Sequence, residues 1–125
     1  MGRRMGRWAV LAGVAVIVAG CGGGGPRGGQ PAAPAEGAIT VTETEWAIRF
    51  PGTPLKAGKA TLVIRNEGTI EHNFVIQGLG VEVDAIPPGG SRQVTVDLRP
   101  GTYEVVCNLP GHLEAGMKTT ITVAP

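Results

Sequence analysis

Aromatic residues are scarce in this sequence and make up only 4% of the chain. Positive charge is also limited, because from residue 21 onward eight Lys or Arg face ten Asp or Glu. A mildly acidic chain with few aromatic side chains has neither the basic surface nor the stacking groups that nucleic-acid binding uses. The composition therefore argues against a nucleic-acid partner.

The chain also lacks an apolar run of the ~20 residues needed to cross a bilayer. Its longest apolar segment, residues 9–19, follows a basic start at residues 1–8, and this pattern indicates a signal peptide. The segment ends in Val-Ala-Gly-Cys at residues 18–21, which resembles the bacterial lipobox. That resemblance implies that Cys21 is acylated and becomes the mature N-terminus. An ordinary signal peptide with a chance Cys and an uncleaved anchor are the alternatives.

The next segment, residues 22–37, is almost entirely Gly, Pro, Ala and Arg, so it has nothing with which to build a core. We expect a signal peptide at 1–20, a lipidated Cys21 with its flexible tether at 21–37, and one folded domain at 38–125. The protein is then exported, with its lipid in a bacterial membrane and its domain facing the periplasm or the cell exterior.

Helical periodicity is absent from residues 38–125, which are rich in Val, Thr and Ile and interrupted by Gly and Pro. The short apolar or alternating segments expected to form strands are 38–44, 46–50, 59–65, 72–77, 81–86, 91–98, 102–107 and 118–124. This pattern predicts an all-β fold, a Greek-key antiparallel β-sandwich of seven or eight strands. The aromatic residues expected in its core are Trp46, Phe50, Phe74 and Tyr103.

Side chains that bind soft metals are few, and they cluster. Beyond Cys21, the only Cys, His and Met residues are His72, Cys107, His112 and Met117. Two His and one Cys with a weak axial Met are the ligand set of a blue copper site. Thiolate and thioether favour Cu(I), whereas imidazole suits both oxidation states. Such a site changes little when one electron arrives or leaves.

These residues also carry a resemblance to a known family, the cupredoxins of the plastocyanin and azurin type. The motifs are His-Asn-Phe at 72–74 and C-x4-H-x4-M at 107–117, a loop spacing similar to that of auracyanin-like members. The resemblance implies a β-sandwich with one copper ion per chain at one end. Its strong ligands would be His72, Cys107 and His112, and Met117 the weak axial one.

The same resemblance implies two supporting features. Asn73, directly after the first His, would tie the ligand loop to the neighbouring strand. The downstream His112 would present its ring edge through an apolar patch where the electron leaves. The residues available for that patch are Leu109, Pro110, Leu113 and Ala115. Glu71 and Glu114 flank the site, and we interpret them as solvated charges, with tuning of the potential or of partner choice as the alternative.

Other chemistries explain the ligand set less well. Structural zinc has no use for Met117, and a binuclear copper centre needs two cysteines. A nucleophile made of Cys107 and His112 lacks a third group and leaves His72 unexplained. We therefore expect no enzyme activity. Copper storage or delivery stays open, although such proteins favour exposed sites that release metal easily. A purely structural adhesion sandwich is a further alternative.

The function predicted from the sequence is thus a membrane-tethered electron carrier that cycles between Cu(II) and Cu(I). Its expected partners are membrane-bound redox proteins, such as a cytochrome complex or a terminal oxidase. The protein itself is expected to be a monomer.

Overall fold

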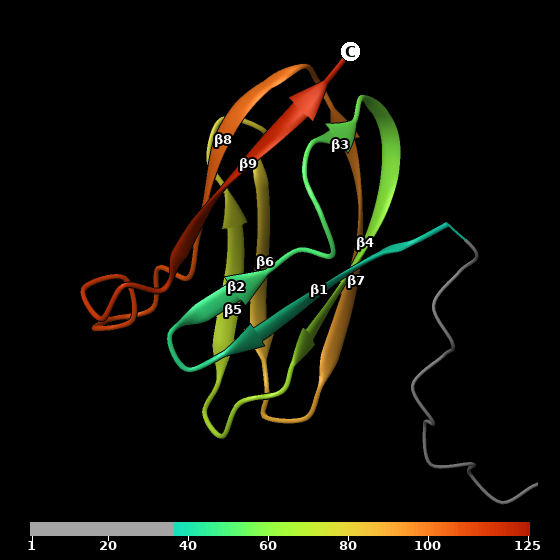
Figure 1. Ribbon diagram of the computed structural model, residues 1–125. Helices are drawn as coiled ribbons and strands as arrows, with labels where there is room; N and C mark the ends of the chain where they lie inside the picture. Colours follow the sequence, from blue (N-terminus) through green and yellow to red (C-terminus); the bar gives the residue numbers. More distant parts are fainter. Residues whose placement is uncertain (1–36) are drawn as a thin grey trace, which may run out of the picture. The chain divides into compact units, whose positions relative to one another are not determined.

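The computed structural model describes residues 37–125, which fold into nine β-strands and their connecting turns (Figure 1). The predicted signal peptide, the predicted lipidation site Cys21 and the predicted tether up to residue 36 lie outside the described residues. The strands are β1 (Ile39–Thr44), β2 (Ala47–Arg49), β3 (Leu55–Lys56), β4 (Gly58–Asn66), β5 (His72–Ile76), β6 (Val81–Ile86), β7 (Ser91–Leu98), β8 (Gly101–Val106) and β9 (Lys118–Ala124). Over the described range, no helix has the length and hydropathy to span a bilayer.

The strands form two sheets, one with the order β2-β1-β4-β7 and the other with the order β3-β9-β8-β5-β6. The predicted all-β sandwich is confirmed, with two differences in detail. Two pairs, β1 with β4 and β3 with β9, are parallel. The ninth strand, β3, is only two residues long, which is too short for a readable alternation. Alternation shows which face a residue occupies but not the direction of its neighbouring strand.

The core lies between the sheets and takes one apolar face from each. Its largest fully buried side chains include Leu62 and Ile64 of β4 and Phe74 and Ile76 of β5. Strand β1 also buries Glu43 on the same face as Val41, and neither carboxylate oxygen of Glu43 has a hydrogen-bond partner within residues 37–125. Removal from water raises the pKa of Glu43 to about 8. The core therefore contains one carboxyl group that folding favours in its neutral form.

The predicted core position of Trp46 is wrong, because 42% of this residue is exposed. Trp46 lies in the two-residue turn between β1 and β2, which the pairing of Thr44 with Ala47 closes. A turn residue lies beyond the last paired position, so its side chain can leave the space between the sheets. Of the other predicted core aromatics, Phe74 is fully buried, and Phe50 and Tyr103 are partly buried and pack against the core.

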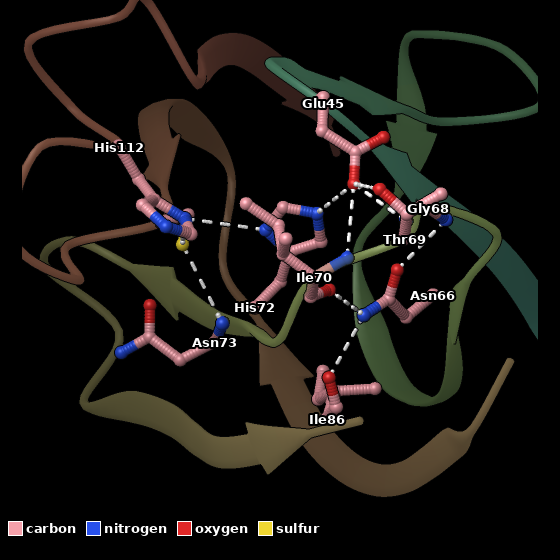
Figure 2. Close-up of polar contacts among 10 residues, drawn as sticks. Glu45, Asn66, Gly68, Thr69, Ile70, His72, Asn73, Ile86 and His112 are labelled. Carbon is pink, nitrogen blue, oxygen red and sulfur yellow. Dashed lines mark hydrogen bonds and ion pairs between the residues drawn. The ribbon is translucent and has the colours of Figure 1, made fainter. Parts of the chain in front are cut away.

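A buried amide shapes the chain between β4 and β5. Asn66 Nδ2 donates to the carbonyls of Ile70 and Ile86, at 2.7 and 2.8 Å. Its Oδ1 accepts the N–H of Gly68 at 2.8 Å (Figure 2). These three bonds satisfy the amide and connect loop 67–71 with the end of β6. The start of β5 is thereby fixed in position, and His72 is its first residue.

Candidate metal centre

Two neighbouring strands bring the first two predicted ligands together. His72 begins β5, and Cys107 directly follows β8. These strands are antiparallel, with Val75 paired to Val106, so the start of β5 lies beside the end of β8. This sheet register places two residues that are 35 positions apart at one end of the sandwich.

The third predicted ligand comes from the loop between β8 and β9. His112 Nδ1 lies 3.3 Å from Cys107 Sγ. It also lies 3.3 Å from His72 Nδ1 (Figure 2). One donor atom from each of the three residues lies within 4.8 Å of the others. His72 and Cys107 are fully buried, and His112 is partly exposed. Three metal-binding atoms therefore converge on one shared point.

Met117 closes the same loop and is fully buried. The N–H of Cys107 donates to the carbonyl of Met117 at 3.1 Å, and the N–H of Met117 donates to the carbonyl of His112 at 3.0 Å. Gly116, just before it, has a φ of 96°, a conformation that residues with a side chain rarely adopt. The loop thus folds back on itself, and all four predicted ligand residues gather at the same end of the domain.

Asn73 joins the two chain segments that carry His72 and Cys107. Its Nδ2 donates to Asn108 Oδ1 at 2.5 Å, and its Oδ1 accepts the N–H of Asn108 at 2.9 Å. Its backbone N–H points at Cys107 Sγ, at 3.5 Å. The predicted role of Asn73 in tying the loop to the strand is confirmed. A backbone N–H directed at the sulfur stabilises negative charge there.

The other ring nitrogen of His72 faces Glu45, a turn residue that the sequence analysis did not single out. His72 Nε2 lies 3.8 Å from Glu45 Oε1 and has no hydrogen-bond partner among the described residues. Burial lowers the pKa of His72 and nearby His112 lowers it further, while Glu45 opposes both. Burial and His112 thus favour the neutral form of His72, which has a lone pair available for a metal.

The donor set fits a type 1 copper ion better than it fits zinc. Two imidazoles and a thiol each place one donor atom within 4.8 Å of the other two. With Met117 beside them, they match the His₂Cys set with a weak axial Met. Structural zinc sites instead use four Cys or His ligands.

Comparison with protein families agrees with this donor set. The family model described as a cupredoxin-like domain matches residues 13–123. The chain belongs to the cupredoxin family. Among curated proteins, none matches the chain significantly.

Solved structures similar to this cupredoxin include two auracyanins. Dithionite-reduced auracyanin from the photosynthetic bacterium Roseiflexus castenholzii is 25% identical, with a TM-score of 0.60, and the match covers 74% of this chain and 100% of that one. Auracyanin B is 26% identical with a TM-score of 0.56, covering 70% and 88%. The Cu(I) form of an amicyanin mutant is 20% identical with a TM-score of 0.56, covering 73% and 86%, and this likeness shows the fold alone.

Exposed apolar side chains of this cupredoxin lie near His112 in space or in sequence. The ring of Trp46 meets the ring of His112 edge-on, with centroids 5.1 Å apart and an angle of 81°. Ile70 and Leu113, from the two adjoining loops, are the other large hydrophobic residues exposed in the described range. Of the predicted patch residues, Pro110, Leu113 and Ala115 are exposed, and Leu109 packs partly against the core.

The sequence analysis did not identify Trp46 and Ile70 as surface residues near the site. Both lie in segments that connect strands, and the residues these segments contact depend on the register of the sheets. No sequence motif reports that register. Glu71 and Glu114 are exposed, in agreement with their interpretation as solvated charges.

Proposed function

We propose that this cupredoxin is a type 1 copper protein that carries single electrons. The observation that carries the proposal is the convergence of His72, Cys107 and His112 donor atoms within 4.8 Å. These three residues are the proposed strong ligands, and the buried Met117 is the proposed weak axial ligand. A copper ion held by this set supplies a one-electron couple between Cu(II) and Cu(I).

Burial of the ligands favours a carrier over an enzyme. His72, Cys107 and Met117 have essentially no exposed surface, so a substrate has no route to an open coordination position. A buried Cys107 is equally unsuited to act as a nucleophile toward an external substrate. Of the four proposed ligands only His112 is partly exposed, and the exposed edge of its ring is enough for an electron to enter or leave the site. That the related auracyanin was obtained in a dithionite-reduced form also supports a redox role.

The protein scaffold favours fast electron transfer by keeping the ligands in place. The Asn73–Asn108 pair and the two backbone hydrogen bonds at Met117 hold the ligand loop through contacts within the chain itself. A site whose ligands are held by the surrounding chain rearranges little when its charge changes. Copper storage or delivery, the alternative, calls for a labile exposed site, and the buried thiol and thioether argue against it.

We also propose that the electron leaves or arrives at His112, whose ring meets the exposed Trp46 edge-on and whose chain neighbour Leu113 is also exposed. The partners would be membrane-bound redox proteins, such as a cytochrome complex or a terminal oxidase. The proposed lipid on Cys21 would keep the domain near them, in the periplasm or at the cell exterior. Cys21→Ser should therefore move the protein into the soluble fraction, and continued membrane retention would contradict the anchor.

Repeated redox cycling tests the carrier function against storage. The copper-loaded protein is reduced with ascorbate, reoxidised with ferricyanide and dialysed against a Cu(I) chelator between cycles. A carrier keeps one copper ion per chain and its full reversible signal through every cycle. Loss of copper to the chelator in the reduced state would favour storage or delivery instead.

A further inference from the structure

The turn that carries Glu45 belongs to one sheet, whereas His72 begins a strand of the other. The carboxylate nevertheless lies 3.8 Å from His72 Nε2, a fully buried nitrogen without a hydrogen-bond partner in the described part of the chain (Figure 2). We propose that Glu45 is a positioning residue for the copper site, which sets the tautomer and the basicity of His72. This inference rests on the proposed function, because it concerns the same ligand.

The two nitrogens of His72 face different environments. Nδ1 faces His112 Nδ1 at 3.3 Å, on the side of the thiol, and Nε2 faces Glu45. A neutral imidazole carries one proton, on either nitrogen. The negative carboxylate favours that proton on Nε2, which leaves the lone pair of Nδ1 directed at the proposed metal position. At 3.8 Å the contact is longer than a hydrogen bond, so the attraction in this structure is electrostatic.

Glu45 is itself held firmly, which a positioning group requires. Its Oε1 accepts the N–H of Thr69 at 2.6 Å, the N–H of Ile70 at 3.1 Å and the hydroxyl of Thr69 at 3.3 Å. The backbone of Gly68 packs so closely against the Glu45 carboxylate that a Cβ at this position would overlap it. All these contacts come from loop 67–71, which leads into His72. The carboxylate thus has a fixed place relative to the imidazole.

A carboxylate behind a metal-bound histidine has a known effect. It fixes the ring orientation and makes the imidazole a stronger donor. A stronger donor and a nearby negative charge both stabilise Cu(II) more than Cu(I). Glu45 should therefore lower the reduction potential of the site. Loss of such an outer partner typically weakens metal binding by about 10–100-fold.

Glu45→Gln separates this role from that of a simple loop latch. The amide oxygen of Gln can still accept the N–H groups of Thr69 and Ile70, but the negative charge is gone. We expect Cu(II) affinity to fall by about tenfold relative to Cu(I) affinity, which raises the potential by about 59 mV for a one-electron couple. In the metal-free full chain in detergent micelles, nitrogen NMR should show the His72 proton on Nε2, and a shift toward Nδ1–H in the variant.

Two matched controls accompany this variant. Thr69→Val removes the hydroxyl contact but keeps the carboxylate, and Glu114→Gln removes an exposed charge from the ligand loop. Both should keep the wild-type tautomer and shift the potential far less than Glu45→Gln does. An equal rise of the potential in Thr69→Val would overturn the proposal, since it would trace the effect to the latch.

The NMR readout keeps this test distinct from that of the proposed function. A wild-type tautomer and potential in Glu45→Gln, in a protein that still forms a type 1 site, would reduce Glu45 to a loop latch and overturn the inference alone. If wild type instead forms no type 1 site, the proposed function fails. The tautomer of metal-free His72 then still decides whether Glu45 sets it.

Discussion

Asn73 and Asn108 form a reciprocal pair, in which the amide of Asn73 donates to the side chain of Asn108 and accepts its backbone N–H. One partner follows His72 and the other follows Cys107. The pair therefore continues the contact between β5 and β8 past the last paired residues, at the point where the two ligands must stay together. Its strength should determine how well the site survives without metal.

Asn73→Ala should lower the free energy of unfolding of the metal-free protein by about 1–3 kcal/mol, because it leaves the N–H of Asn108 without its partner. Asn108→Ala should cost less, since its backbone N–H can still donate to Asn73. Chemical denaturation of the two variants measures the difference. Equal stability of Asn73→Ala and wild type would show that the pair contributes nothing to holding the site.

Met117→Gln should retain copper but lower the reduction potential, because an oxygen donor is harder than a thioether and favours Cu(II). Met117→Leu removes the axial donor without adding oxygen, and it should shift the potential in the opposite direction. Voltammetry of both variants checks this. If both potentials equal that of wild type, Met117 does not contact the metal.

The buried Glu43 should make folding stability depend on pH. Its pKa is raised to about 8 in the folded protein, from 4.5 in the unfolded chain. Between these values the folded state binds more protons than the unfolded state, so the stability contributed by this group falls as pH rises from about 4.5 to 8. Below that range its contribution no longer changes.

Glu43→Met tests this dependence with an apolar side chain of similar length. It should flatten the decline of stability between pH 5 and 8. At pH 8 it should stabilise the protein by about 1–3 kcal/mol, because it removes a buried carboxyl that has no hydrogen-bond partner in the described part of the chain. Unfolding curves at several pH values measure both effects. The same decline in wild type and variant would mean that another group causes it.

The proposed ligand residues stand out in the sequence because residues 22–125 contain so few soft donors. His72, Cys107, His112 and Met117 are the only Cys, His and Met residues after Cys21. Alternation likewise revealed most strands, since it reports which face of a sheet each residue occupies. The two-residue β3 is too short to show alternation. The parallel pairing of β1 with β4 does not change the alternation pattern, so the pattern could not reveal it.

The residues around the ligands could not be predicted in the same way. Glu45 and Trp46 lie in a turn far from every ligand in the sequence, and only the three-dimensional path of the chain brings them to His72 and His112. Their neighbours depend on strand order and on the course of two loops. Patterns in a short stretch of sequence show neither the strand order nor the course of the loops. This is also why Trp46 was wrongly expected in the core.

An optical titration of the metal-free protein with Cu(II), beside its Cys107→Ser variant, tests the central claim most directly. We predict an intense visible thiolate-to-copper band that saturates at one copper ion per chain, bleaches with ascorbate and returns with ferricyanide. Cys107→Ser should lack this band, because serine supplies no thiolate. A wild-type protein without the band, or a variant that keeps it, would contradict the assignment of a type 1 copper site to these residues.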